Sequence, residues 1–276
     1  MSEEIYPEIP DWARSDIDLS KASAARIYDY LLGGYHNFEI DRETIEKSIL
    51  VNPNVRPAAI ANRSFLRRAV NFLLDQGIDQ FLDIGTGIPT VGNVHEIVQS
   101  ANPKAHVVYV DIDPVAVAHS RSILQGNSRV VAIQGDARRP KELLENPELQ
   151  ALLDFSRPIG VLFVAVLHFV PEDDLAYNSV YTLRDALPSG SYIVISHSTY
   201  ENVPPDVYEK ILKIGNQVSV TFKHRKLLEM KRFFEGLELV DPGVVYVPLW
   251  RPETPDDTFL DEPERAVNYG GVGRKP

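Results

Sequence analysis

The feature that most constrains the fold is a short apolar segment followed by a glycine turn, Phe81-Leu82-Asp83-Ile84-Gly85-Thr86-Gly87. Its apolar residues suit a parallel strand that is covered on both faces. Gly85 and Gly87 lack a Cβ, so the backbone can turn sharply and a ligand can lie against it. Residues Val91–Ser100 then place apolar side chains at helical spacing. Such a strand, turn and helix face the crevice where open α/β sheets bind ligands.

From Gln80 onward the sequence alternates apolar strand segments with helical patterns, which predicts an α/β fold with a mostly parallel sheet. After the first strand, the expected strands are 106–110, 129–133, 159–166 and 191–195. Leu237–Val240 and Val244–Val247 flank Asp241-Pro242-Gly243, which predicts a closing antiparallel hairpin. Before the sheet, we expect an irregular arm over residues 1–18 and then three helices. The first is capped by Ser20 and runs through Leu31, and the second is capped by Asp41 and covers Arg42–Leu50. The third covers Pro57–Gln76.

Composition excludes several classes of site. The 276 residues contain no cysteine, so no disulfide, thiolate metal site or cysteine nucleophile exists. A net charge of −11 argues against an extended nucleic-acid surface, and the basic cluster at 223–226 is expected to be a solvated helix face. The longest apolar run, Ile159–Leu167, is too short to cross a bilayer. With no secretory signal at the start of the sequence, the expected location is cytoplasmic.

Three acids, Asp83, Asp111 and Asp136, follow three successive strands, so they should project into one crevice. Asp111 can accept two ribose hydroxyls, and Asp136 can accept from the amine of an adenine. Asp83 lies near the turn, where carboxylates suit a cationic ligand better than a pyrophosphate. The third small residue of the dinucleotide fingerprint is absent, since Thr90 occupies that position. Alternatively, each acid only caps a turn or helix.

The motif Asp83-x-Gly85-x-Gly87 resembles the first motif of S-adenosylmethionine (SAM) dependent methyltransferases. A closer resemblance lies in 23–37, in Asn62-Arg63-Ser-Phe-Leu, in Leu167-His-Phe-Val-Pro171 and in the final Gly-Gly-Val-Gly-Arg-Lys. Together these are similar to an actinobacterial SAM-dependent methyltransferase family, long catalogued as a domain of unknown function. The resemblance runs nearly end to end. It implies a Rossmann-like class I fold with a seven-stranded sheet, SAM as ligand, S-adenosylhomocysteine (SAH) as product and an N-terminal helical cap.

On this basis we expect an arm and helical cap over 1–77, a SAM-binding domain over 78–250 and a C-terminal tail over 251–276. Arg63 can pair with the methionyl carboxylate of SAM, because a guanidinium matches a carboxylate in two hydrogen bonds. The alternative is that Arg63 ties two cap helices together through Asp29. The residues expected to contact the cofactor are Gly34, Arg63, Asp83, Gly85, Thr86, Gly87, Asp111, Ile112, Asp136, Ala137 and Ala165.

Two histidines at strand ends, His168 and His197, are candidate bases for an acceptor that must lose a proton. Each can equally be a histidine bonded to a strand-end backbone group. No metal site is expected, since Gln99 replaces the second histidine of the motif begun by His95-Glu96. The sequence thus predicts methyl transfer from SAM to a small-molecule acceptor. A SAM-binding regulatory protein and, less favoured, a NAD-dependent oxidoreductase stay open as alternatives.

Overall fold

Five apolar segments form the parallel centre of a sheet in the computed structural model, which describes residues 21–88, 92–215, 221–254 and 257–276. The strand order is β3-β2-β1-β4-β5-β8-β6, and β7 pairs with β8. The predicted α/β class with a mostly parallel sheet is confirmed. The strands are β1 Gln80–Ile84, β2 His106–Asp111, β3 Val130–Gln134, β4 Gly160–Val164, β5 Tyr192–Ser198, β6 Glu238–Leu239, β7 Val245–Tyr246 and β8 Asn268–Arg274.

The antiparallel edge differs from the predicted hairpin. The short strands β6 and β7 do not pair with each other, and each pairs with β8 instead. β8 comes from the region that we expected to be a tail, and it pairs along its whole length with β5. The sheet therefore has eight strands rather than seven. The seven-residue β8 offers a long partner on both sides, whereas two two-residue strands cannot hold each other in place.

The glycine-rich sequence of β8 has a packing explanation. A Cβ built on Gly270 would lie 2.9 Å from Phe65, and one on Gly273 would lie 2.9 Å from Phe234. Aromatic rings therefore press against both faces of the strand, where only glycine leaves enough room. This part of the resemblance motif stabilises the sheet and does not line the cavity described below.

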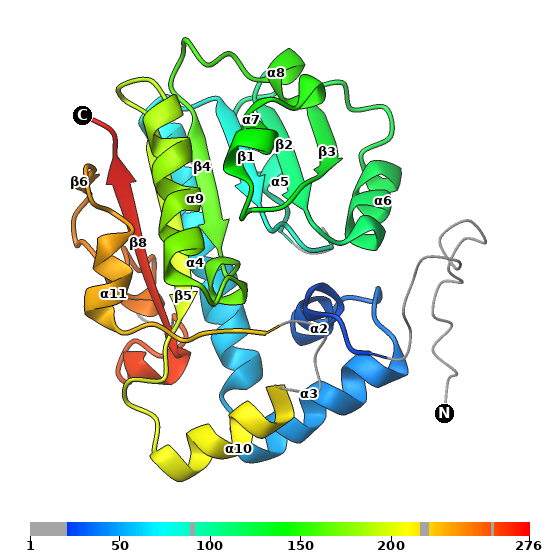
Figure 1. Cartoon of the computed structure of the whole chain (residues 1–276), viewed down its shortest axis with the longest axis vertical. Coiled ribbons are helices and arrows are strands. Elements are labelled where there is room, and N and C mark those ends of the chain that lie inside the picture. Colours follow the sequence, from blue (N-terminus) through cyan, green and yellow to red (C-terminus); the bar gives the residue numbers. More distant parts are fainter. Residues whose placement is uncertain (1–20, 89–91, 216–220, 255–256) are drawn as a thin grey trace.

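Helices cover both faces of the sheet (Figure 1). One face packs against α4 Val55–Asp75, α5 Val94–Ala101 and α6 Pro114–Ile123. The other packs against α7 Pro140–Leu144, α8 Pro147–Leu152, α9 Asp173–Ala186 and α11 Leu227–Arg232. Short 3-10 turns complete the connections, at η1 Leu167–Phe169, η2 Val247–Leu249 and η3 Pro263–Ala266.

A group of helices, which we call the cap, lies beyond the carboxyl ends of the parallel strands (Figure 1). It consists of α2 Ala24–Leu31, α3 Glu39–Val51, the N-terminal half of α4, and α10 Pro205–Gly215, which packs on α3. The buried ion pair between Arg26 and Asp41 joins α2 to α3 at 2.7 Å. Asp41 also accepts from the N–H of Phe38 and so completes the start of α3. The predicted N-terminal helical cap is present, and α10 extends it. The Ser20 cap lies outside the described residues.

Two other local predictions are wrong. The helix after the glycine turn begins at Val94, where Asn93 and Glu96 form a capping box, and not directly after the turn. Thr90 and Val91 lie outside the described residues. The basic cluster is not a solvated helix face either, because α11 begins only at Leu227 and Arg225 is buried.

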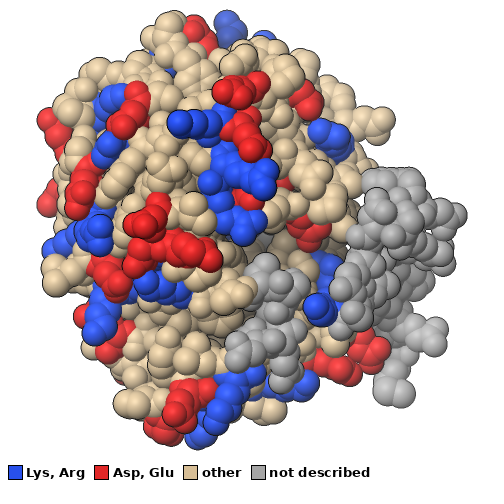
Figure 2. Space-filling model, viewed as in Figure 1, with Lys and Arg blue, Asp and Glu red and all other residues tan. Residues whose placement is uncertain are grey.

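On the face shown in Figure 2, acidic and basic side chains are interspersed, so that face carries no broad field of one sign. Among the described residues, no helix is long and apolar enough to span a membrane.

Candidate functional site

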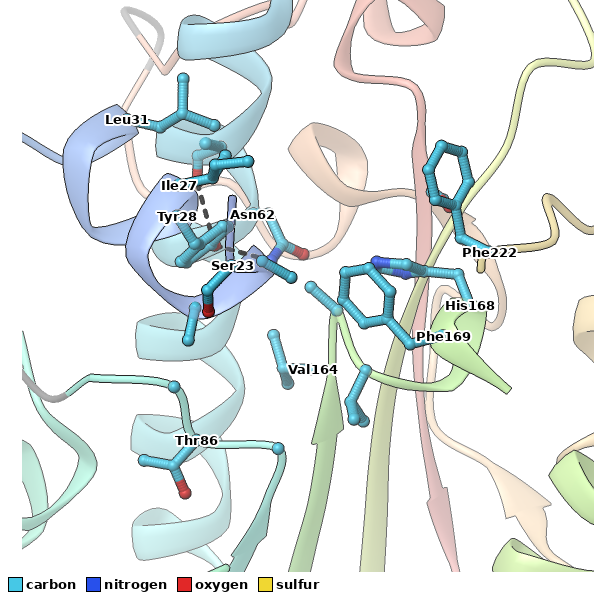
Figure 3. A pocket seen from close by; sticks show the side chains of 18 of the residues that line it. Ser23, Ile27, Tyr28, Leu31, Asn62, Thr86, Val164, His168, Phe169 and Phe222 are labelled. Carbon is cyan, nitrogen blue, oxygen red and sulfur yellow. Dashed lines mark hydrogen bonds between the residues drawn. The ribbon is translucent and has the colours of Figure 1, made fainter. Parts of the chain in front are cut away.

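A cavity of about 580 Å³ lies between the carboxyl ends of the strands and the cap. Figure 3 shows Thr86 and Val164 on one side of it, with Leu31, Ile27 and Phe222 on other sides. We call the part lined by strand-end residues the strand portion. We call the part lined by α2, α3, α10, His168, residues 222–224 and Val267 the cap portion. The strand portion is lined by Asp83, Gly85, Thr86, Gly87, Asp111, Ile112, Asp113, Asp136, Ala137, Arg138 and Ala165.

The glycine turn after β1 has the conformation that its sequence requires. Gly85 and Gly87 have φ values of 73° and 66°, in the left-handed region that favours glycine. A Cβ on Gly85 would also collide with the side chain of Val166. The hydroxyl of Thr86 donates to the carbonyl of Asp83 at 3.1 Å and closes the turn. The turn therefore leaves a smooth backbone surface toward the cavity.

Asp111 at the end of β2 holds this turn in place. Its Oδ2 accepts from the N–H of Gly87 at 2.7 Å, and its Oδ1 accepts from the N–H of Asp113 at 2.9 Å. Burial raises the pKa of the Asp111 carboxyl, and these hydrogen bonds oppose that rise. Asp113 caps α6 through the N–H of Val115 and accepts from the hydroxyl of Ser23, so it also connects the cap to the sheet.

Asp83 is the most perturbed acid of the cavity. Burial raises its pKa to about 7, while the positive charge of Arg63 lowers it and the neighbouring Asp111 raises it further. A carboxyl kept partly protonated by burial gains from a nearby cation, because the cation stabilises its ionised form.

The third strand-end acid is already paired. Both oxygens of Asp136 accept from Arg138, at 2.7 to 3.0 Å. Burial acts to raise the pKa of Asp136, but this pairing outweighs it and lowers the pKa. Asp136 nevertheless lines the cavity, as do Ala137 and Ile112. Ile112 is 52% exposed, so its side chain is free to cover a flat ligand.

Ala165, directly after β4, has a left-handed backbone with a φ of 57°. Its N–H donates to the carbonyl and the hydroxyl oxygen of Ser196. Strained residues of this kind are concentrated at ligand sites, and Ala165 does line the cavity.

Arg63 and Asn62, on α4, line the cavity at the junction of its two portions. The Nε of Arg63 and the Oδ1 of Asn62 are buried and have no hydrogen-bond partner among the described residues. The Nδ2 of Asn62 donates to the hydroxyl of Tyr28 at 3.0 Å, a contact drawn in Figure 3. Arg63 does not tie the cap together through Asp29, whose carboxylate accepts from His36 and Asn37 instead. Two polar groups at this junction are thus available to a ligand.

Gly34 is not among the residues that line the cavity. A Cβ on Gly34 would collide with the carboxylate of Asp29, which explains the glycine by packing in the loop after α2. Of the residues expected to contact the cofactor, Gly34 is the one that the structure leaves outside the cavity.

The two candidate bases have different surroundings. His168, on η1, lines the cavity, and its ring points into it in Figure 3. His197 is buried outside the cavity. Its Nδ1 lies 2.8 Å from the carbonyl of Ser198, and its Nε2 lies 2.9 Å from Arg225. Burial lowers the pKa of His197 to about 3, so it is a neutral structural histidine. The prediction of His197 as a base is not supported.

Most of the cap portion, including a third histidine, is not predicted from the sequence. His224 lines the cavity next to Phe222, and its Nδ1 lies 2.9 Å from the hydroxyl of Ser198. The only sequence signal was the basic cluster that contains His224, and we interpreted that cluster as solvated. No group of three or more metal-ligating side chains occurs in the described part of the chain.

A family model described as S-adenosyl methyltransferase matches residues 10–276. The chain belongs to this family. As a member of this family, the protein is an enzyme that transfers a methyl group from SAM. The match also confirms the resemblance found in the sequence. It favours this activity over the regulatory and oxidoreductase alternatives.

Two crystal structures are similar to the chain over nearly its full length. One is a provisionally assigned methyltransferase from Thermobifida fusca YX, with 39% identity, a TM-score of 0.88 and coverage of 96% of this chain and 99% of that one. The other is a DUF574 family protein from Streptomyces avermitilis MA-4680, with 38% identity, a TM-score of 0.88 and coverage of 94% and 99%. No curated protein matches the chain.

Proposed function

We propose that the cavity binds SAM in its strand portion and a small-molecule methyl acceptor in its cap portion. The observation that carries this proposal is the division of one cavity into two chemically different parts. Apart from Arg63 at the junction, the Asp and Arg side chains that line it lie at or just after the carboxyl ends of β1, β2 and β3. The cap portion offers apolar side chains, histidines and the uncharged hydroxyl groups of Tyr28, Thr44 and Ser48. A volume of about 580 Å³ lies within the range of small-molecule sites, about 300–1,000 Å³.

The strand portion fits the adenosine half of SAM. Each carboxylate oxygen has two acceptor positions, so Asp111 can hold Gly87 and Asp113 and still accept from ribose hydroxyls. Ile112 and Ala137 offer an apolar side chain and a small one to the adenine ring. Asp136 already accepts hydrogen bonds from Arg138, so it must accept from the adenine amine in addition to them.

The junction fits the methionyl half. The unpartnered Nε of Arg63 can donate to the SAM carboxylate, and the unpartnered Oδ1 of Asn62 can accept from the SAM ammonium. The positive charge of SAM favours the ionised form of Asp83, whose pKa burial has raised. In this arrangement each charged group of SAM has an opposite or hydrogen-bonding partner.

SAM supplies an electrophilic methyl group, and the residues of this chain position the two reactants. Displacement on a methyl group requires the acceptor atom to lie in line with the breaking bond, so holding both molecules in one cavity provides much of the rate. The cap excludes water from the reacting atoms.

Calorimetric titration with SAM and with SAH tests the proposal. We expect saturable binding of both, near one site per chain. Asp111→Ala should weaken SAM binding by about 1–3 kcal/mol, because a charged hydrogen-bond acceptor is lost. Asp185→Ala is the matched control, since it removes an exposed carboxylate that does not line the cavity. Folded protein that binds neither molecule would refute the assignment.

A further inference from the structure

The cap portion contains no ionised side chain among the described residues. The charged residues that line the cavity are Arg63, Asp83, Asp111, Asp113, Asp136 and Arg138, which belong to the strand portion and the junction. The apolar lining of the cap portion includes Ile27, Leu31, Ile45, Ile211, Phe222 and Val267, and the hydroxyl groups of Tyr28, Thr44 and Ser48 there are uncharged. A charged acceptor would lose its hydration here without gaining a partner, so this part favours an uncharged molecule with an apolar body.

Two imidazoles provide polar positions in these apolar surroundings. Within the described part of the chain, neither ring nitrogen of His168 has a hydrogen-bond partner, and its Nδ1 is fully buried. His224 uses Nδ1 toward Ser198, while its Nε2 is buried without a partner. Leaving a buried polar atom unsatisfied costs about 1–3 kcal/mol, so two such atoms at one cavity point to a ligand that supplies their partners.

The position of His168 is fixed by the buried guanidinium of Arg225. Arg225 donates to the carbonyls of Leu167 and Val170, on either side of His168, at 3.2 and 3.0 Å. Asp173 accepts from Arg225 at 2.9 Å and holds it in place. The N–H of Lys223 donates to the carbonyl of His168 itself at 2.8 Å. These contacts orient His168 before any acceptor binds.

His168 is also held in its neutral form. Burial, followed by the charges of His197, His224 and Arg225, lowers the pKa of its imidazole well below the usual value. A neutral imidazole can accept a hydrogen bond from a hydroxyl group. It disfavours an ammonium acceptor, which would add a second positive charge to an apolar space.

We infer that the acceptor is an uncharged, largely apolar molecule that presents a hydroxyl group to His168 and a second polar atom to His224. This inference rests on the proposed function. The hydroxyl oxygen forms a bond to the methyl carbon while the bond from carbon to sulfur breaks and its electron pair stays on sulfur. The hydroxyl proton passes to the imidazole of His168. The products are a methyl ether, SAH and one proton, which His168 releases to solvent.

A weak base is sufficient for this step. The hydroxyl oxygen becomes positively charged as the new bond forms, so its proton becomes far more acidic than in the free hydroxyl compound. His168 therefore needs only to be correctly placed and unprotonated, as general bases contribute about 10²–10⁴-fold to a rate.

Matched probes test the charge preference. With the protein saturated by SAH, we would titrate hydroxylated arenes such as 2-naphthol alongside their carboxylate, aminomethyl and unsubstituted counterparts. The hydroxylated arenes should bind at least tenfold more tightly than the other three series. With SAM, the expected product is the methyl ether, detected by mass spectrometry. Tighter binding of a charged series, or no binding of any hydroxylated arene to the SAH complex, would overturn the inference.

Variants test the two histidines. His168→Gln should keep SAH affinity and probe affinity within a few-fold and reduce kcat about 10²-fold or more. His224→Phe should raise KM for the hydroxylated probe and leave kcat nearly unchanged. His106→Gln is the control, because His106 does not line the cavity. Equal kcat for His168→Gln and wild type would overturn the role of His168. If the wild-type protein does not bind SAH, that result would count against the proposed function instead.

Discussion

The two portions of the cavity are built in different ways. The strand portion takes its polar residues from the carboxyl ends of β1, β2 and β3 and the positions just after them, and these strands are neighbours in one parallel sheet. The cap portion combines residues of α2, α3 and α10 with residues 222–224, which are far apart along the chain. The strand portion is charged and the cap portion is apolar. The comparison indicates that the sheet determines how the donor is bound, while the elements added around it select the acceptor.

The first prediction concerns the support of the cap portion and has the largest expected effect. Arg225→Met should destabilise the protein by about 1–3 kcal/mol for each buried group left unsatisfied, because the carbonyls of Leu167 and Val170 both lose their donor. Arg157→Met is the control, since Arg157 forms an exposed pair with Asp79 and should cost about 0–1 kcal/mol. Chemical denaturation measures both. Equal effects would show that the buried guanidinium of Arg225 does not stabilise the acceptor side.

The second prediction tests the junction between the portions. Arg63→Met should weaken SAH binding by about 1.5–3 kcal/mol, the usual range for a hydrogen bond to a charged group. The same variant should bind 5′-methylthioadenosine as well as wild type does, because that molecule lacks the carboxylate. Calorimetry with the two ligands separates the effects. A similar loss of affinity for both ligands would show that Arg63 does not contact the methionyl end.

The third prediction is a pH dependence of the strand portion. The pKa of Asp83 is raised to about 7, and a cationic ligand favours the ionised carboxylate. Binding must therefore release a proton below that pKa, so SAM affinity should rise as pH increases toward 7 and then level off. The expected slope is at most about tenfold per pH unit. Asp83→Asn should flatten the profile, and an unchanged slope would contradict the pairing of Asp83 with the SAM cation.

The strand portion could be predicted because its signals are local. Asp83, Gly85, Gly87 and Asp111 each stand at a fixed offset from an apolar strand, and parallel strands bring their carboxyl ends together. Asp136 was correctly located, but its pairing with Arg138 could not be foreseen, since a residue two positions along can point in several directions.

The cap portion could not be predicted in the same way. Arg225 lies in a basic cluster that resembles a solvated helix face, and only the tertiary contact with Asp173 explains its burial. His224 lies next to Arg225 in the sequence, so the same tertiary contact positions it at the cavity. The insertion of β8 between β5 and β6 is another long-range feature. Sequence patterns describe neighbours along the chain, whereas these contacts depend on how distant segments meet.

The placement of β8 has a consequence for the order of folding. In the described part of the chain, β6 and β7 have no strand partner other than β8. Neither can join the sheet before β8 has docked on β5, across a long separation in sequence, and pairings of this kind form slowly. The antiparallel edge should behave as one cooperative unit, whose amide protons exchange together and earlier than those of the parallel centre.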